Sequence, residues 1–276
     1  MNPVIKLSSP ATSEFWEILV LFEDDHLLAL DKPAGLLTSP DRYDPLRPNL
    51  MKLLHAGISA GKPWVTQRGI DYLMNAHRLD FETSGVILLA KSKPVLVQLA
   101  NLFGSEKPLK TYITLVRGTP ASAAFEVDAP LAPHPVQIGL MRIDRKQGKK
   151  SKTRFELIEA FPRAGCALLK CQPVTGRTHQ IRAHLRHAGL PIVGDDLYGG
   201  KPLWLSRLKP NYRLKSGHEE RPLVARVALH AEQLALTHPV TQQPVVITAP
   251  WPKDLTVALK YLRKFGSNSG AENPEG

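Results

Sequence analysis

One short stretch, residues 77–85, carries the residue types from which a catalytic site can be built. It reads His-Arg-Leu-Asp-Phe-Glu-Thr-Ser-Gly and places one acid, Asp80, between a basic residue and a Thr-Ser-Gly turn. The apolar run that follows, residues 86–90, predicts a strand that is covered on both faces. Asp80 is therefore expected on a loop held by the core, where a reactive carboxylate is well positioned. The alternative interpretation is an ordinary turn-forming aspartate.

A second polar stretch, residues 175–186, reads Thr-Gly-Arg-Thr-His-Gln-Ile-Arg-Ala-His-Leu-Arg. Thr178 is predicted to cap a helix that Gly189 ends. The positions expected to be buried on one face of this helix are Ile181, Leu185 and Ala188. An arginine near the start of such a helix can hold a carboxylate ionised and oriented through a two-pronged contact. Arg182 and Arg186 lie one turn apart, on a neighbouring stripe of this helix.

The bulk properties favour a polyanionic partner. The chain has 276 residues, a net charge of +11 and a pI near 9.7, which indicates nucleic acid before an acidic membrane surface. Its two cysteines, Cys166 and Cys171, lack the C-x-x-C spacing of redox or zinc sites, so they are expected to be buried free thiols in a reducing cytosol. No signal peptide and no apolar run of about 20 residues is visible.

The first third of the chain predicts the elements that must position Asp80. Residues 1–15 are expected to be a flexible segment, followed by strands at 18–22 and 27–30. Asn49 can cap a short helix that Gly57 stops, and residues 57–70 are expected to form a loop. Ser92 can cap a further helix that Gly104 ends.

The rest of the chain predicts a β-rich region closed by a helix. Expected strands cover 110–117, 153–160 and 167–171, and a hairpin covers 234–248. Residues 142–154 are densely basic, and a solvated loop and a phosphate-contacting loop are both possible there. Residues 200–228 are basic and irregular and are expected to form a second surface that faces the nucleic acid. The closing helix is expected to begin near Asp254 and to bury Leu255, Ala258, Leu259 and Leu262. Residues 266–276 are expected to be a disordered tail.

Two other motifs suggest a nucleotide site and a zinc site, but their residues do not meet the chemical requirements of either. Residues 85–92 approach a P-loop pattern, but Ala90 replaces the glycine before the lysine and apolar residues fill the loop, so a strand fits better. Histidines occur at His179, His184, His187 and His230. No acid or cysteine in the motif completes a zinc set, and arginines beside them would oppose a cation. The histidines are therefore expected to be polar or RNA-facing groups, and no metal is expected.

The order of these motifs resembles the RluA-type pseudouridine synthases, which isomerise selected uridines in RNA to pseudouridine. The residues that carry the resemblance are His-Arg-Leu-Asp-x-x-Thr-Ser-Gly at 77–85, Ala-Lys at 90–91, Lys-Pro-Ala-Gly at 32–35, Lys-x-Tyr at 110–112, the stretch 175–199 and Leu-His-Ala at 229–231. The resemblance covers about residues 18–250.

The resemblance implies roles for individual residues. Asp80 is the essential catalytic aspartate, and Arg182 is the active-site arginine paired with it. Tyr112 stacks on the target base, although a half-buried strand tyrosine is the common alternative. Arg78 fills the stack vacated by the flipped base or contacts a phosphate. The other residues expected to bind the substrate are His77, Thr83, Arg177, His179, Gln180 and Leu234.

The resemblance also implies a fold and partners. It predicts an α+β domain over residues 16–265, with a mixed, mostly antiparallel sheet, flanking helices and a central basic cleft. No cofactor is expected, and the partner is RNA, either ribosomal or transfer RNA. A cytoplasmic monomer is expected, without the small N-terminal RNA-binding module of many relatives. Phe81 stands where relatives often have an arginine or another polar residue, so one RNA contact is expected to be missing there.

Two functions from other classes compete with this interpretation. An RNA-binding protein of the same fold without catalysis would be expected to lack Asp80, Tyr112 or Arg182, and all three are present. An RNA-directed hydrolase would need a second catalytic carboxylate or a metal cluster beside Asp80, and neither is evident in the motifs.

Overall fold

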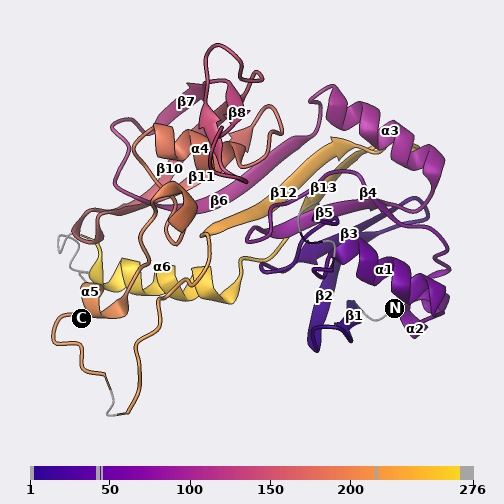
Figure 1. Ribbon diagram of the computed structural model, residues 1–276, viewed down its shortest axis with the longest axis horizontal. Helices are drawn as coiled ribbons and strands as arrows, with labels where there is room; N and C mark the ends of the chain where they lie inside the picture. Colours follow the sequence, from indigo (N-terminus) through magenta and orange to yellow (C-terminus); the bar gives the residue numbers. More distant parts are fainter. Residues whose placement is uncertain (1–2, 42–43, 45, 215–216, 268–276) are drawn as a thin grey trace, which may run out of the picture. The chain divides into compact units, whose positions relative to one another are not determined.

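The computed structural model describes residues 3–41, 44, 46–214 and 217–267 (Figure 1). The chain forms two compact units. The prediction of one catalytic domain over residues 16–265 stays a prediction. Unit 1 contains residues 1–110 and 231–250, and unit 2 contains residues 111–230 and 251–276. The last predicted segment, 266–276, lies outside the described residues from position 268 onward.

Unit 1 is built on an antiparallel sheet that contains the strand expected after Asp80. The order along the sheet is β1-β2-β3-β5-β12, with β13 on β12 and the short β4 on β5. The strands are β1 Val4–Ser9, β2 Glu14–Glu23, β3 Leu27–Lys32, β4 Met74–Asn75, β5 Ser84–Ala90, β12 Leu229–Thr237 and β13 Pro244–Thr248. All seven residues of β5 are buried, so the prediction of a strand covered on both faces is confirmed.

Successive strand residues point to opposite sides of the sheet, so each face has its own set of apolar side chains. Helices cover both of these faces. Leu28, Leu30, Ile87 and Leu89 pack with α1 Leu50–Ser59 and α2 Pro63–Arg68. The alternate residues Leu27, Ala29, Val86 and Leu88 pack with α3 Lys93–Gly104 and with β12 and β13. Figure 1 shows α1 and α2 together at the N-terminal strands. The loop before β5 is thus anchored by a strand whose two faces are both covered by apolar side chains.

Three sequence predictions in unit 1 are wrong. Residues 4–9 form β1 rather than a flexible segment, because Ile5 and Leu7 turn inward and the strand pairs with β2. Helix α1 runs past Gly57, because the absent side chain makes room for the indole of Trp64, which lies where a Cβ would stand. Residues 63–68 form α2 with proline in its first turn, within a predicted loop. The caps predicted at Asn49 and Ser92 are confirmed.

Unit 2 has its own antiparallel strands, in the order β6-β11-β10-β7, and a separate hairpin β8-β9. Their bounds are β6 Leu109–Arg117, β7 Ala124–Asp128, β8 Leu131–Pro133, β9 Met141–Ile143, β10 Lys152–Phe161 and β11 Cys166–Pro173. The helical elements are η1 Pro162–Ala164, α4 Gln180–His187, η2 Asp196–Tyr198, α5 Leu205–Leu208 and α6 Lys253–Phe265. Strands β6 and β12 each carry the chain from one unit into the other. Helices α4 and α6 contribute apolar side chains to one core.

The closing helix meets its prediction, and the helix of the second polar motif meets its own in part, since Ile181 and Leu185 are buried and the helix ends before Gly189. The four predicted apolar residues of α6 are buried. Helix α4 begins at Gln180 rather than after Thr178, because His179 is its N-cap residue and has a left-handed backbone with φ of 52°. Ala188 is exposed, and Arg182 and His184 are buried instead. Cys166 and Cys171 are buried free thiols, as predicted, and burial raises the pKa of both.

Gly85 explains why the Thr-Ser-Gly turn can enter β5. Its φ is 111°, and a Cβ at this position would lie 2.2 Å from the carbonyl oxygen of Ala231. Only glycine allows β5 and β12 to approach so closely at this point. The predicted α+β class with a mostly antiparallel sheet is confirmed. Within the described ranges, no helix is both long and apolar enough to cross a membrane.

Candidate active site

The loop that carries Asp80 is held by its backbone on both sides of that residue. The side chain of Thr38 accepts a hydrogen bond from the Leu79 N–H at 3.1 Å and donates to the Leu79 carbonyl at 3.0 Å. On the other side, the Phe81 carbonyl accepts from the Gly35 N–H at 2.9 Å. Both Thr38 and Leu79 are buried. The backbone at Asp80 is therefore fixed before any substrate binds.

A buried lysine completes this brace. Lys32, from the Lys-Pro-Ala-Gly motif, is fully buried. Its ammonium donates to the carbonyls of Leu36 at 2.6 Å and Pro33 at 2.8 Å, with a longer contact of 3.5 Å to the Phe81 carbonyl. Buried ammonium groups are costly unless such acceptors surround them. Lys32 and Thr38 are positioning residues that the sequence analysis did not assign.

Asp80 itself is half-buried, and its carbonyl accepts from the Thr83 N–H at 3.2 Å, which closes a turn. Arg78 is exposed beside it, as a residue that contacts RNA must be. Thr83 is buried, and Leu234 packs in the core with α3. The geometry favours positioning roles for Thr83 and Leu234 over the predicted substrate contacts.

His77 also faces inward. Its Nε2 accepts a hydrogen bond from the Leu88 N–H at 3.1 Å, and its ring stacks on Phe103 with centroids 4.9 Å apart. Burial, and then the charge of Lys110, lower the pKa of His77 to about 3. The ring is therefore neutral, with its proton on Nδ1. His77 fixes the start of the loop to β5, a role that differs from the predicted substrate contact.

We expect the substitution His77→Gln to flatten the acid dependence of stability. The unfolded histidine binds a proton below about pH 6.5, and the folded one does so only near pH 3. The contribution of this group is complete above about pH 6.5 and is lost by up to about 1.4 kcal/mol per pH unit as the pH falls toward the folded pKa. Glutamine keeps an acceptor for Leu88 but does not titrate. Urea unfolding at neutral and mildly acidic pH would measure this, and equal acid sensitivity of both proteins would contradict it.

The guanidinium of Arg47 lies against the ring of Phe81. The Cζ atom of Arg47 lies 3.8 Å from the Phe81 ring centroid, the geometry of a cation–π contact. Arg47 is half-buried. Among the described residues it has no carboxylate within ion-pair distance. The positive charge expected to be missing at position 81 is therefore supplied beside it from the loop before α1.

In unit 2 the predicted arginine has a partner that the sequence analysis did not assign. Arg182 is buried, and its Nε and Nη2 donate to the two carboxylate oxygens of Asp195 at 2.7 and 2.8 Å. Asp195 also accepts from the Tyr198 N–H, and the Tyr198 ring lies 5.0 Å from the guanidinium. Arg182 is thus held in one orientation by a fork-like ion pair. Its pairing with Asp80 stays a prediction.

The other residues of the second motif divide into inner and outer groups. Gln180 is buried and bonds to Thr175, to the Arg177 N–H and to the Lys152 carbonyl, so it ties the motif to β10. Arg177 is exposed, and its Nε donates to the Lys150 carbonyl. The ring of His179 lies beside the Tyr198 hydroxyl, with Nδ1 at 3.1 Å. Gln180 is a structural hub, whereas Arg177 remains a candidate RNA contact.

Tyr112 is placed by strand β6 and the buried His184 by helix α4. Tyr112 is half-buried on β6 opposite Cys171 and packs against the core of unit 2, which agrees with either of its interpretations. His184 is fully buried between Thr153 and the Ala129 carbonyl, at 2.9 Å from each. Burial lowers the pKa of His184. The expectation that His184 is a polar or RNA-facing group is wrong, because both ring nitrogens are used inside the fold.

The predicted site residues therefore belong to both units. Unit 1 carries His77, Arg78, Asp80, Thr83 and Leu234, and unit 2 carries Tyr112, Arg177, His179, Gln180 and Arg182. Within the part of the chain that the structure describes, no three His, Cys, Asp or Glu side chains gather as a metal site would require. Unit 1 fixes the backbone of the loop that carries Asp80, and unit 2 holds the Arg182 side chain in its ion pair.

Comparison with known proteins gives consistent results. The sequence model of the RNA pseudouridylate synthase family matches residues 26–187. Ribosomal large subunit pseudouridine synthase C of Vibrio vulnificus is 36% identical over 245 residues, which are 89% of this chain and 69% of that protein. Synthase D of Xanthomonas campestris is 34% identical over 277 residues, 95% of this chain and 74% of that protein. The solved structure of human RNA Pseudouridylate Synthase Domain Containing 4 has a TM-score of 0.65 at 25% identity and covers 88% of this chain and 92% of its own.

Proposed function

Because the chain belongs to the RNA pseudouridylate synthase family, it is an isomerase of RNA uridines, and we propose that its substrate is the ribosomal RNA of the large subunit. The names of its relatives C and D support this choice over transfer RNA. The net charge of +11 agrees with a polyanionic substrate. A cytoplasmic site of action and a monomeric state complete the proposal.

The reaction breaks the N-glycosidic bond, turns the base and rejoins it to the sugar through carbon. We propose Asp80 as the catalytic carboxylate. The single observation that carries this role is the loop brace: hydrogen bonds at Leu79 and Phe81 fix the backbone on each side of Asp80. The carboxylate can remove a sugar proton, attack the sugar or add to the base, and each route needs it ionised and pre-positioned.

Roles for the residues of unit 2 follow from their fixed orientation. We propose that Arg182 keeps Asp80 ionised and oriented when RNA is bound, which its immobilisation by Asp195 supports. Tyr112 stacks on the flipped target base, a contact that stabilises by roughly 1–3 kcal/mol. Arg78 fills the vacated stack, which its exposure supports.

The Arg47–Phe81 pair gives a testable RNA contact. We expect Arg47→Ala to weaken RNA binding several-fold and to reduce the slope of log K against log salt concentration by about 0.7–0.9, the effect of one lost phosphate contact. Phe81→Arg in the same background should restore both, since it returns a guanidinium to the same place. Lys62→Ala removes an exposed charge of unit 1 and serves as the control. A salt slope that Arg47→Ala leaves unchanged would refute the contact.

The function is tested by tritium release from RNA labelled at C5 of uridine. Total ribosomal RNA and total transfer RNA are offered separately to the protein. We expect release from ribosomal RNA, because C5 of the uracil loses its hydrogen when it forms the new glycosidic bond to the sugar. Release from transfer RNA alone would overturn the substrate assignment. RNA binding without release from either pool, or from assembled large subunits, would favour a binding protein of this fold that lacks catalysis.

A further inference from the structure

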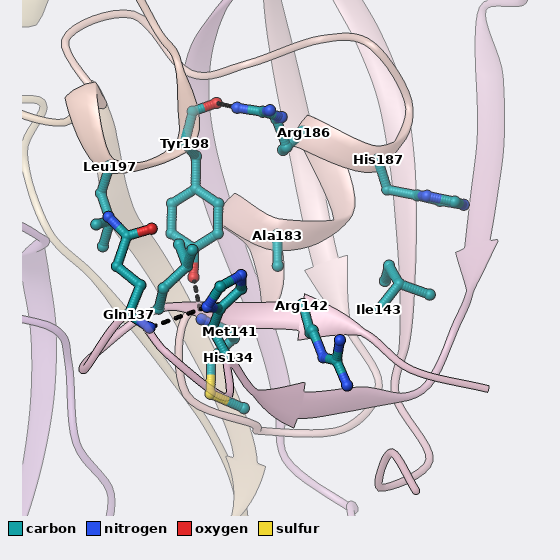
Figure 2. Close-up of a pocket in the computed structure, with 11 residues that line it drawn as sticks. His134, Gln137, Met141, Arg142, Ile143, Ala183, Arg186, His187, Leu197 and Tyr198 are labelled. Atoms are coloured by element: carbon teal, nitrogen blue, oxygen red, sulfur yellow. Dashed lines mark hydrogen bonds between the residues drawn. The ribbon is translucent and has the colours of Figure 1, made fainter. Parts of the chain in front are cut away.

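Unit 2 contains a pocket that the proposed catalytic roles leave unused. Its volume is about 660 Å³, within the range of roughly 300–1,000 Å³ that small-molecule sites occupy. Its walls are the loop and strand at 134–143, the C-terminal half of α4 and the η2 turn (Figure 2). The pocket is large enough for a nucleotide.

The rim of the pocket is cationic. Arg142, Arg186 and His187 line it, and none of its lining residues is acidic. Arg186 is held in place because its Nη1 donates to the Tyr198 carbonyl at 2.9 Å (Figure 2). Arg142 contacts Asp144, a residue outside the lining, at 2.7 Å. Arg186 and His187 both line the pocket from the C-terminal end of α4, and a guanidinium held in one orientation favours a phosphate ligand.

The floor of the pocket is largely apolar. Leu140, Met141 and Ala183 line it together with the Tyr198 ring, whose hydroxyl accepts from the Met141 N–H at 2.9 Å. Figure 2 shows the short Ala183 side chain projecting from α4 toward β9. Such a floor accepts the flat face of a base without reading its hydrogen-bonding edge.

The loop at the mouth of the pocket exposes apolar side chains. Val136 is 84% and Ile138 is 74% exposed to solvent. Exposed apolar groups beside a cationic rim occur where single-stranded nucleic acid is bound, because bases and phosphates are engaged together. The adjoining basic residues 142–154 extend the positive surface along the chain.

We propose that this pocket binds an unpaired nucleotide of the RNA substrate other than the target uridine, an inference that rests on the proposed function. The base lies on the apolar floor, and its phosphate contacts Arg186. The site adjoins the candidate catalytic arginine, since the Tyr198 ring that lines the pocket also contacts Arg182. RNAs with an unpaired nucleotide at the matching distance from the target are therefore preferred.

Binding of a labelled oligoadenylate of about 12 nucleotides tests the pocket without involving catalysis, because this RNA has no uridine. Ala183→Leu fills the pocket without changing charge, and we expect about a tenfold loss of affinity from the lost base contact with an unchanged salt slope. Arg186→Gln should weaken binding and also reduce the salt slope by about 0.7. Lys260→Gln removes an exposed charge of α6 and should change binding least.

The outcomes separate this proposal from the proposed function. Wild-type affinity in a folded Ala183→Leu protein, or no binding of oligoadenylate by the wild type at low salt, would overturn the nucleotide site. If the pocket binds a protein segment instead of RNA, Ala183→Leu would leave the affinity for oligoadenylate at its wild-type value. If Ala183→Leu lowers the thermal midpoint, Ile143→Phe fills the pocket from the opposite wall and replaces it. Failure of catalysis would appear separately, as absent tritium release from the wild-type protein.

Discussion

Asp80→Asn is expected to abolish pseudouridine formation while RNA binding stays nearly intact. Asparagine has the same shape but cannot act as a base or a nucleophile, so turnover should fall by about a thousandfold or more. The loop should keep its form, because the brace uses only the backbone of Leu79 and Phe81. RNA affinity should change little, since phosphate contacts dominate it.

Single-turnover tritium release with enzyme in excess would measure the loss, and fluorescence anisotropy with the same RNA would measure binding. Asp71→Asn is the matched control, since Asp71 is an exposed carboxylate of the same unit. It should release tritium at the wild-type rate. Wild-type turnover by Asp80→Asn would show that another group carries the reaction.

Breaking the Arg182–Asp195 pair is expected to destabilise the fold strongly. The Asp195 side chain is fully buried and that of Arg182 is 6% exposed. Removal of either partner leaves an uncompensated buried charge, which costs about 3–5 kcal/mol. We therefore expect Arg182→Ala and Asp195→Ala to lower the free energy of unfolding by about this amount each, and the double variant to lose clearly less than the sum.

Urea unfolding of the two single variants and the double variant measures the coupling. The control is Arg263→Ala, which breaks an exposed ion pair with Glu159 in the same unit. Exposed pairs contribute about 0–1 kcal/mol, so this variant should unfold almost like the wild type. Strictly additive losses at Arg182 and Asp195 would contradict a direct pair in solution.

This destabilisation means that activity lost in Arg182→Ala has two possible causes. Arg182→Lys separates them, because lysine keeps the positive charge beside Asp195 but loses the planar fork. We expect a folded protein whose turnover falls well beyond its loss of RNA affinity. Turnover and affinity that fall equally would make Arg182 a binding residue, and wild-type turnover would restrict it to stability.

The sequence alone was sufficient wherever a signal is local. The apolar run of β5, the caps at Asn49 and Ser92 and the buried face of α6 were all predicted correctly. Periodicity and capping depend on neighbours within a few residues, so they can be read without the fold. The motif around Asp80 identified the family for the same reason, because its residues are contiguous.

The predictions that failed depend on residues distant in the sequence. Strand β1 has only two buried apolar residues, Ile5 and Leu7, and it forms because it pairs with β2 over its whole length. Helix α1 continues through Gly57 because Trp64, from the next helix, fills the space there. Thr178 does not cap α4, because the helix begins one residue after His179, at Gln180, whose side chain is hydrogen-bonded to Lys152 and Thr153 of β10. In each case a tertiary contact outweighed local propensity.

The sequence determined which chemistry this protein has, and the tertiary structure decided which polar residues are available for it. His77, Gln180 and His184 share their motifs with Asp80 and Arg182, yet their side chains are bonded inside the fold. A buried polar group must find a hydrogen-bond partner, and that partner can come from any part of the chain. The counterion of Arg182, Asp195, and the guanidinium of Arg47 on the Phe81 ring are likewise distant in the sequence, so only the tertiary structure identifies them.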